Sequence, residues 1–188
     1  MAEETRHHVE ANGWRNVLPL WAVVGYPLDR STDVGPLARP DLVTDLVDQV
    51  RRTVAAGARL VLGGAPLSGP GNLFPPTLVT GVTPGMAAWD EETFGPVAVV
   101  ARARDTAHAI ELANASPFGL AASLWTADTK MAQEIATELE VGGVFINATV
   151  RSDPRLPFGG VRRSGHGREL GRFGIAEFVN LRTVWVGD

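Results

Sequence analysis

The stretch PVAVVARARDTAHAIELANASPFGLAASLWTADTKMAQEIATELEVGGVFIN, from Pro96 to Asn147, decides the fold. It alternates short apolar runs with longer runs in which apolar residues recur at helical spacing. The elements that it predicts are, in order, a central strand at 96–103, a helix at 105–116 capped by Asp105, a strand at 119–127, a helix at 128–142 stopped by Gly142, and a strand at 143–149. Strands and helices that alternate at this spacing are typical of βαβ crossovers, which pack helices on the faces of a parallel sheet. We therefore expect an α/β fold in which these strands lie side by side in a parallel sheet.

Upstream of this stretch, apolar residues at helical spacing predict a helix that begins at Asp41 and ends near Gly57. These apolar residues are Leu42, Leu46, Val47, Val50 and Val54. An aspartate suits the start of a helix, and a glycine suits the left-handed turn that ends one. Short strands are expected at 59–64 and at 77–79, separated by a loop rich in proline and glycine.

Downstream of Asn147 the alternating pattern stops. A long loop rich in glycine and arginine is expected up to residue 171, followed by a short helix at 172–180. The last apolar segment, LRTVWV at 181–186, alternates in the manner of a strand. No partner strand lies near it in the sequence, so we expect an edge strand that is available to another chain.

The composition is that of an ordinary globular protein, and it argues against several classes of function. The chain has 188 residues, of which 45% are hydrophobic, and a formal net charge of −4. Nucleic-acid-binding proteins usually have a basic face, and no apolar stretch here reaches the ~18–20 residues of a membrane span. The polar, acidic first residues lack the pattern of a secretory signal, so we expect a cytoplasmic protein. One domain, or one domain with a small appendage, fits this length.

Cysteine is absent from the 188 residues. Within these residues the absence rules out disulfides, thiolate metal sites and a cysteine nucleophile, because all of them need sulfur. The four histidines also lack a spacing typical of metal ligands, so no metal site is predicted.

Three further patterns allow a chemical role but have simpler interpretations. GHGRELG at 165–171 resembles a dinucleotide-binding fingerprint, but its glycine spacing is one residue too long and a loop precedes it. Ser164, His166 and Asp153 are the residue types of a hydrolase triad, yet the nucleophile elbow G-x-S-x-G is missing. A structural glycine loop is the favoured interpretation of both patterns. Six arginines in the same segment suit either anion binding or solvated loop charges, namely Arg151, Arg155, Arg162, Arg163, Arg168 and Arg172.

The segment DEETFGPVAVV, from Asp90 to Val100, places three acids in front of an apolar strand. An acidic turn on the surface is the simpler interpretation, and a ligand site is the alternative. Ligands of open parallel α/β folds bind beyond the carboxyl ends of the strands. Because this cluster precedes its own strand, spacing alone favours the surface interpretation.

Several motifs, in the order in which they occur, resemble those of the aldehyde dehydrogenase superfamily. EETFGPV at 91–97 resembles the family's E-x-F-G-P motif, and YPLDRSTDVGPLA at 26–38 resembles its G-D-P-L-D-P-x-T-D-x-G-P-L segment. The tail, DPRLPFGGVRRSGHGRELGRFGIAEFVNLRTVWV, is similar to that of bacterial succinate-semialdehyde dehydrogenases. The resemblance implies an α/β catalytic domain of the aldehyde dehydrogenase type. Its implied parts are an unmatched segment at 1–20, a partial catalytic domain at 21–180, and an oligomerisation strand with the C-terminus at 181–188.

The resemblance also implies roles for matched positions. Glu92, the glutamate of E-x-F-G-P, is expected to form hydrogen bonds with the nicotinamide-ribose hydroxyls of NAD or NADP. Phe94 is expected to pack near that ribose and the nicotinamide. Ser152 falls where semialdehyde dehydrogenases place a serine near the substrate carboxylate. Leu181–Val186 matches the strand that joins a partner subunit's sheet in the family, which implies a homo-oligomer.

Three parts of the family's enzymes have no counterpart in the matched region. The NAD(P)-binding domain, the catalytic glutamate and the nucleophilic cysteine all lie upstream of the family segment that YPLDRSTDVGPL resembles, and aldehyde oxidation in the family needs that thiolate. We therefore expect a truncated aldehyde dehydrogenase without a catalytic residue of its own. Alone, it should neither oxidise succinic semialdehyde or another aldehyde nor bind NAD(P). Two alternatives stay open: an interaction module that pairs through 181–186 with itself or with a full-length relative, and one half of a split enzyme.

Overall fold

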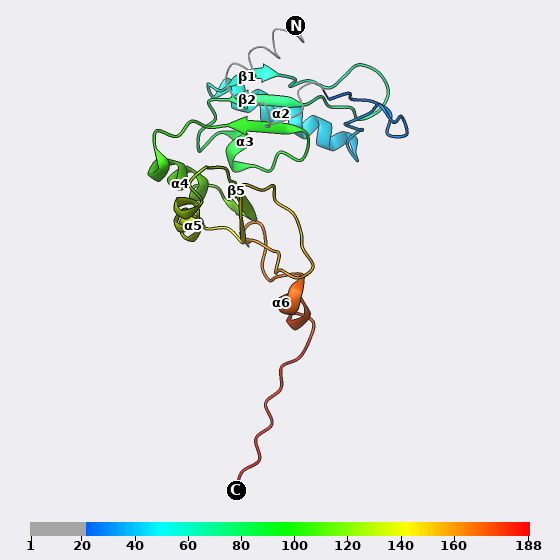
Figure 1. The fold of residues 1–188 in the computed structure, drawn as a ribbon. Helices are drawn as coiled ribbons and strands as arrows, with labels where there is room; N and C mark the ends of the chain where they lie inside the picture. Colours follow the sequence, from blue (N-terminus) through cyan, green and yellow to red (C-terminus); the bar gives the residue numbers. More distant parts are fainter. Residues whose placement is uncertain (1–21) are drawn as a thin grey trace. The chain divides into compact units, whose positions relative to one another are not determined.

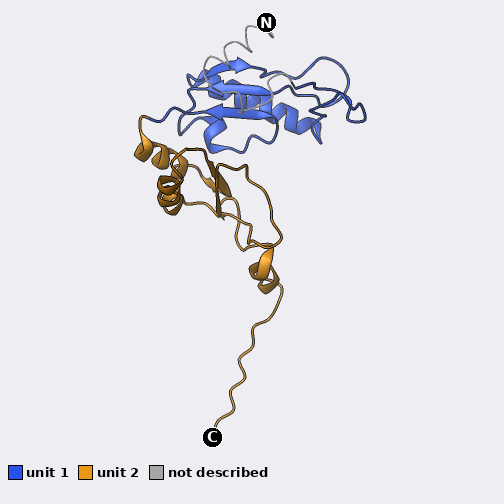
Figure 2. Cartoon of the chain, in the orientation of Figure 1, with its two compact units in different colours: residues 1–103 blue, residues 104–188 orange. Residues whose placement is uncertain are grey.

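The computed structural model describes residues 22–188, so the unmatched segment expected at 1–20 lies outside the described residues. The chain forms two compact units, Met1–Ala103 (unit 1) and Arg104–Asp188 (unit 2), which Figure 2 colours separately. Each unit combines helices with a pair of parallel strands. The expected α/β class with parallel sheet is therefore confirmed.

Unit 1 is built on a three-stranded sheet (Figure 1). Its strands are β1 (Arg59–Leu62), β2 (Thr77–Thr80) and β3 (Val97–Val100), in the spatial order β1-β2-β3. β2 runs antiparallel to β1 and parallel to β3, with Thr80 opposite Val100. Both short strands predicted upstream of β3 are therefore confirmed.

The apolar run at 96–103 forms β3, but the prediction that this strand is central is wrong within the described sheet. β2 is the central strand: Leu78 and Val79 are 1% and 0% exposed, whereas Val99 of β3 is 36% exposed. β2 has a hydrogen-bonded neighbour on each side, while β3 has one among the described residues. A run of branched apolar residues fits either position, so composition does not separate a central strand from an edge strand.

Helix α2 (Pro40–Ala55) confirms the helix predicted in this region, but its cap differs from the expectation. Pro40 occupies the first helical position, which tolerates a fixed φ and a missing N–H, and Arg39 is the N-cap residue. Asp41 therefore lies inside the first turn, where its carboxylate accepts hydrogen bonds from Arg39 and complements the helix dipole. The left-handed turn expected at Gly57 is confirmed by its φ of +107°.

One face of α2 packs against the core of unit 1. Val50 joins a buried cluster with Ala58, Val79 and Val82, against which Met86, Trp89 and Val97 pack. The expectation that Val54 lies on this face is wrong, because its side chain is 38% exposed. The four buried residues of α2 are Leu46, Gln49, Val50 and Thr53. Two of these four are polar, and the polar pair needs hydrogen-bond partners in the interior.

Unit 2 contains a βαβ crossover of the kind that the sequence predicts (Figure 1). Strands β5 (Ala121–Leu124) and β6 (Gly143–Ile146) pair in parallel, and α5 (Thr129–Glu138) connects them. Helix α4 (Thr106–Asn114) precedes β5. The cap predicted at Asp105 is confirmed, since its carboxylate accepts a 2.8 Å hydrogen bond from a backbone N–H in the first turn of α4.

The further expectation that successive strands lie side by side fails at one crossover. β3 pairs with β2, and β5 pairs with β6, so β3 and β5 belong to different sheets among the described residues. Strands that follow each other in sequence are neighbours in only about two-thirds of cases. A second, antiparallel pair in unit 2 joins β4 (Phe118–Gly119) to β7 (Val161–Arg162).

The C-terminal part of unit 2 ends in an extended segment. Helix α6 (Gly171–Ala176) is shorter than the helix expected at 172–180. Residues 180–188 form neither helix nor strand, and Leu181 and Trp185 are 87% and 88% exposed. Within residues 22–188, no backbone hydrogen bond ties the segment at 181–186 to the rest of the chain. Its pairing with another chain stays a prediction.

The turn that leads into β6 depends on a close backbone approach at Gly142. The N–H of Gly142 donates to the carbonyl of Gly119 at 3.0 Å, and a side chain at this position would overlap the carbonyl of Gly159. Helix α5 ends at Glu138, so Gly142 does not stop it as expected. The glycine is needed instead because two backbone segments meet there.

We predict that Gly142→Ala destabilises unit 2 by about 3 kcal/mol or more, because displacing backbone costs at least as much as overpacking side chains. Gly143→Ala is the matched control, since the nearest atom to its methyl would be Cε2 of Phe145 at 3.4 Å. Urea unfolding followed by circular dichroism measures both free energies of unfolding. Equal midpoints for the two variants would contradict this account of the turn.

Candidate functional site

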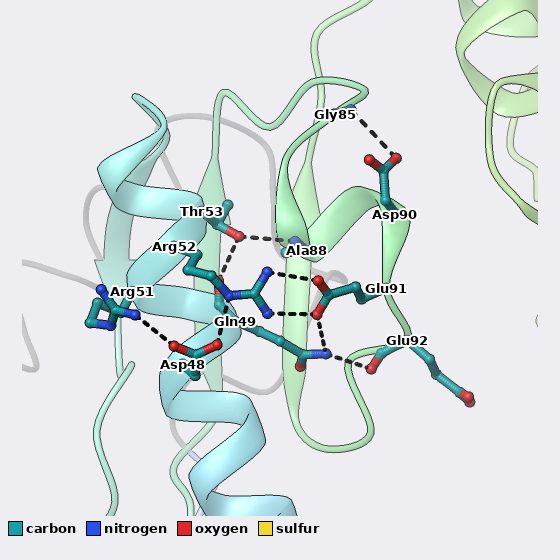
Figure 3. Close-up of polar contacts among 10 residues, drawn as sticks. All are labelled: Asp48, Gln49, Arg51, Arg52, Thr53, Gly85, Ala88, Asp90, Glu91 and Glu92. Atoms are coloured by element: carbon teal, nitrogen blue, oxygen red, sulfur yellow. Dashed lines mark hydrogen bonds and ion pairs between the residues drawn. The ribbon is translucent and has the colours of Figure 1, made fainter.

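The segment from Glu91 to Gly95 crosses one face of α2, and Figure 3 shows its first two residues, Glu91 and Glu92, beside that helix. The segment contains both residues for which a cofactor contact is expected. It follows the short helix α3 (Ala87–Asp90) and leads into β3. Three residues of α2, spaced three apart, hold it in place. The contacting pairs are Arg52 with Glu91, Gln49 with Glu92, and Leu46 with Gly95. A spacing of three residues keeps these side chains on one face of the helix.

Arg52 binds Glu91 with both terminal nitrogens. Nη1 and Nη2 donate to Oε1 and Oε2 of Glu91, each at 2.7 Å, in the bidentate geometry that matches guanidinium to carboxylate. Nε donates to Asp48 at 2.6 Å, so the guanidinium is held from two sides. The side chains of Arg52 and Glu91 are 40% and 41% exposed, so water screens the pair. Its main effect is therefore to fix where Glu91 lies.

These contacts shift the pKa of both carboxyl groups in the same direction. The hydrogen bonds from Arg52, with a smaller contribution from Gln49, lower the pKa of Glu91 below its ordinary value. The hydrogen bonds from Arg51 and Arg52 likewise lower the pKa of Asp48. Both carboxylates are therefore charged at neutral pH and remain charged well into the acid range.

Gln49 lies beneath the segment and is 8% exposed. Its Nε2 donates to Oε2 of Glu91 at 3.2 Å and to the backbone carbonyl of Glu92 at 3.0 Å (Figure 3). Both amide hydrogens are thereby used, and the reversed amide would place its oxygen against two acceptors. Oε1 is buried without a partner among the described residues. The two donor contacts therefore decide the orientation of this amide.

Thr53 docks the start of α3 on the same face of α2. Its hydroxyl donates to the carbonyl of Gln49 at 2.7 Å and accepts from the N–H of Ala88 at 2.9 Å. The side chain is fully buried, so both bonds are shielded from water. Helix α3 is consequently fixed at its first turn by Thr53 and beyond its last residue by the contacts to Glu91 and Glu92.

Phe94 lies at the centre of a tight turn. The N–H of Gly95 donates to the carbonyl of Thr93 at 2.8 Å, which closes a three-residue turn. The turn leaves the ring of Phe94 60% exposed. The side chain of Glu92 is also exposed, and within residues 22–188 its carboxylate makes no hydrogen bond. Its acceptor sites are therefore unused within the part of the chain that the structure describes.

Glu92 and Phe94 line one surface hollow. The other residues that line it are Glu91 and, from α2, Leu42, Asp45, Leu46, Asp48, Gln49 and Arg52. The volume of the hollow is about 240 Å³. Pockets that bury a drug-sized ligand measure about 300–1,000 Å³, so this hollow is too small to enclose a ligand of that size. A free carboxylate accepts hydrogen bonds from hydroxyls, and an exposed ring offers an apolar face. The hollow can thus bind and orient a ligand, and it offers no thiol nucleophile.

Of the three expected site residues, the structure brings two together. Glu92 and Phe94 share the hollow in unit 1. Ser152 is exposed in the loop that follows β6, in unit 2. The roles of all three toward cofactor and substrate stay predictions.

Contacts within unit 2 account for several residues of the glycine- and arginine-rich loop. The contacts are Arg155 with Asp153, Arg162 with Glu140 and the carbonyls of Asn114 and Ser116, and Arg168 with the carbonyls of Gly160 and Gly167. They favour a structural role for these three arginines over anion binding. Ser164 accepts a 3.1 Å hydrogen bond from the N–H of Gly119, and Gly165 and Gly167 have φ of +105° and +77°. These observations support the interpretation of a structural glycine loop.

The sequence alone missed the residues that hold the site. Gln49 and Thr53 stand among the apolar residues of α2 at helical spacing, which is the one local signal that they face inward. The partners of Arg52 and Gln49 lie about forty positions away in the sequence, so no local pattern reveals them.

The described residues offer neither a metal site nor a membrane-spanning helix. Among residues 22–188, no group of three or more histidine, aspartate or glutamate side chains is placed to hold a metal ion. None of the helices in this range has the length and apolarity needed to cross a membrane. The cytoplasmic location expected from the sequence stays a prediction.

Comparisons with known proteins agree on one group of relatives. Residues 21–184 match the aldehyde dehydrogenase family. A probable NADP⁺-dependent succinate-semialdehyde dehydrogenase from Synechocystis is 52% identical over 163 residues, which are 87% of this chain and 36% of that protein. An Escherichia coli K12 succinate semialdehyde dehydrogenase named for NAD(P)⁺ is 52% identical over 162 residues, 86% of this chain and 35% of that protein. The chain thus spans just over a third of the length of these curated relatives.

Solved structures give the same picture of the fold. Succinic semialdehyde dehydrogenase from Streptococcus pyogenes, in complex with NADP⁺, superposes with a TM-score of 0.84 at 35% identity, over 89% of this chain and 37% of that chain. A variant of an aldehyde dehydrogenase from Bacillus cereus reaches a TM-score of 0.88 at 34% identity, over 96% of this chain and 37% of that chain.

The lowered pKa of Glu91 predicts how stability depends on pH. In the folded chain this carboxyl binds its proton at lower pH than in the unfolded chain. The charged carboxylate therefore contributes fully to the free energy of unfolding at pH values above its ordinary pKa of 4.5. As pH falls below that value, the unfolded chain takes up the proton first and the free energy of unfolding decreases. Urea unfolding from about pH 7 down to about pH 3 measures this slope.

We expect Glu91→Gln to flatten the slope of stability against pH in this range. Asp90→Asn is the matched control, because the adjacent acid makes only a 3.4 Å contact with the N–H of Gly85 and no ion pair with Arg52. A slope that is identical in wild type and Glu91→Gln would show that the ion pair has no part in the pH dependence.

Proposed function

Because the chain belongs to the aldehyde dehydrogenase family, we propose that it supplies the cofactor-facing part of the catalytic domain of an NAD(P)-dependent dehydrogenase that acts on succinic semialdehyde. The observation that carries this proposal is the placement of Glu92 and Phe94 on one hollow, where residues 22–188 make no hydrogen bond to the carboxylate and the ring is exposed. The names of the relatives, which refer to succinate semialdehyde and to NADP⁺ or NAD(P)⁺, support the choice of substrate and cofactor.

The residues at the hollow fit the nicotinamide ribose. The Glu92 carboxylate can accept hydrogen bonds from both ribose hydroxyls, since each of its oxygens offers acceptor sites. The ring of Phe94 offers an apolar surface beside that sugar and the nicotinamide. When bound, the nicotinamide supplies the hydride acceptor for oxidation of the aldehyde carbon. Glu92 and Phe94 hold and orient it, and neither of them takes part in bond making.

Ser152 is our candidate for the group that binds the carboxylate end of the substrate. Its hydroxyl can donate a hydrogen bond to a carboxylate oxygen. The exposed position of its loop leaves the side chain accessible to a ligand. Arg151 precedes it and is exposed as well, so a positive charge lies next to the proposed contact in the sequence.

The nucleophile has to come from outside these residues. None of the 188 residues is a cysteine, and oxidation of an aldehyde in this family needs a thiolate. We propose that these residues alone neither bind NAD(P) measurably nor turn over an aldehyde. They become part of an active site when a polypeptide with the thiol and the dinucleotide-binding domain completes the fold, in the same chain or as a separate half.

Complementation tests this proposal. The purified 188-residue chain is mixed with the part of the Escherichia coli relative that precedes its matched third, and NADPH formation from succinic semialdehyde is followed by absorbance. We expect no turnover by either piece alone and measurable turnover by the mixture. Glu92→Gln should raise the KM for NADP⁺ about 10- to 100-fold, because a hydrogen bond to a charged group contributes about 1.5–3 kcal/mol.

Asp90→Asn provides the matched control for that experiment. Asp90 belongs to the same acidic run but does not line the hollow, so its variant should behave like wild type. Turnover by the 188-residue chain alone would refute the need for a second piece. A Glu92→Gln mixture with an unchanged KM for NADP⁺ would refute the ribose contact.

An interaction module is the second candidate function, and the segment at 181–186 is the observation that favours it. Val184 and Val186 are 77% and 84% exposed, and no backbone hydrogen bond within residues 22–188 uses this segment. Exposed, unpaired backbone next to apolar side chains is suited to strand addition onto another sheet. We propose that the segment pairs with a second copy of this chain or with a full-length relative.

Light scattering after size-exclusion chromatography measures this association. We expect the 20.0 kDa chain to elute as a dimer or larger species, and Thr183→Pro to shift it to monomer, because proline cannot donate to a strand ladder. Thr183→Val keeps the N–H and should associate like wild type. A monomeric wild-type chain that also fails to bind a full-length relative would exclude this function.

A further inference from the structure

The position of Glu92 is set by its backbone, not by its side chain. Within residues 22–188 the carboxylate makes no hydrogen bond and the side chain is exposed. Among these same residues, one hydrogen bond holds its carbonyl, the 3.0 Å bond from Nε2 of Gln49. Whatever fixes this amide therefore also fixes the direction in which the Glu92 side chain leaves the chain.

The Gln49 amide is itself held from the opposite side. Its second hydrogen is donated to Oε2 of Glu91, and that carboxylate is fixed by the two 2.7 Å bonds from Arg52. Gln49 is 8% exposed and Nε2 has acceptors on both sides, so the amide has little freedom to rotate. Arg52 thus acts on Glu92 through Glu91 and Gln49, without touching the Glu92 side chain.

We propose that Gln49 and Arg52 are positioning residues for Glu92, which hold its carboxylate at the ribose end of the hollow. This inference rests on the proposed function, in which Glu92 binds the nicotinamide ribose. Both residues belong to α2, and Leu46 on the same face packs against Gly95. One rigid helix therefore holds the whole segment from Glu91 to Gly95 in place. Binding groups need to be held within about 0.5 Å of the productive geometry, and side chains on a helix supply that precision better than a loop does.

Kinetics of the complemented enzyme test the inference. Gln49→Leu keeps the size of the side chain and removes both donors, and Arg52→Met keeps the stem and removes the guanidinium. Each should raise the KM for NADP⁺ about tenfold and leave the KM for the aldehyde unchanged, since a shift of about 1 Å in a binding group can cost a factor of up to about 100. Arg51→Met is the matched control, because Arg51 also pairs with Asp48 but makes no contact with Glu91.

A double-mutant cycle separates positioning from general stabilisation. If Gln49 acts through Glu92, Gln49→Leu should have no further effect on the KM for NADP⁺ in the Glu92→Gln background. If Gln49→Leu instead raises the KM for NADP⁺ by the same factor in the wild-type and Glu92→Gln backgrounds, the inference is overturned. If Glu92→Gln itself has no effect, the proposed function fails, whereas an effect of Glu92→Gln without any effect of Gln49→Leu and Arg52→Met refutes only the positioning role.

A readout that needs no activity completes the test. In the NMR spectrum of the 188-residue chain, the amide of Thr93 reports on the Glu92–Thr93 peptide whose carbonyl Gln49 binds. Gln49→Leu should move and broaden that resonance, and Arg52→Met should do so to a smaller extent, which covers the case in which Gln49→Leu does not fold. Arg51→Met should leave it in place. Unchanged Thr93 resonances in both Gln49→Leu and Arg52→Met would overturn the inference.

Discussion

The contact of one face of α2 with the segment from Glu91 to Gly95 is the constraint on which the candidate site depends. A helix rises about 1.5 Å per residue, so Arg52 and Leu46 lie about 9 Å apart along the axis. The facing segment would span about 13 Å if it were fully extended, because a strand rises about 3.3 Å per residue. The three-residue turn closed by Gly95 N–H and the Thr93 carbonyl shortens it to fit. The exposure of Phe94, at the centre of that turn, is thus a consequence of matching the segment to the helix.

Periodicity located most of the elements because each is an unbroken local pattern. It failed where contacts between residues far apart in the sequence decide which side chains are buried and which strands pair. The apolar stripe on α2 places Val54 inside, yet the buried face turns toward Gln49 and Thr53. An N–H of α3 bonds to Thr53, and the carboxylate of Glu91, the residue after α3, accepts from Gln49. Order along the chain likewise could not show that β3 pairs with β2 and not with β5, since sheet order depends on contacts between residues far apart in sequence.

The site illustrates the same limit at the level of single residues. Spacing alone treats Asp90, Glu91 and Glu92 as one acidic turn, whereas the structure separates them: Glu91 is bound to Arg52, and the carboxylate of Glu92 has no partner among residues 22–188. The resemblance to a family selects Glu92 without giving a physical reason. The reason is that successive side chains of an extended segment point in opposite directions. The side chain of Glu91 therefore contacts α2, and that of Glu92 points away from it (Figure 3).

The distribution of buried residues has a consequence for how the two units fold. Of the buried apolar side chains among residues 22–188, only Ala132 and Leu139 belong to unit 2, while Phe178 there is 90% exposed. A unit with so small an interior gains little from hydrophobic burial of its own. Where a second polypeptide covers that surface, folding and association become one linked equilibrium. The melting temperature of unit 2 then depends on protein concentration, in the way that the stability of an obligate dimer does.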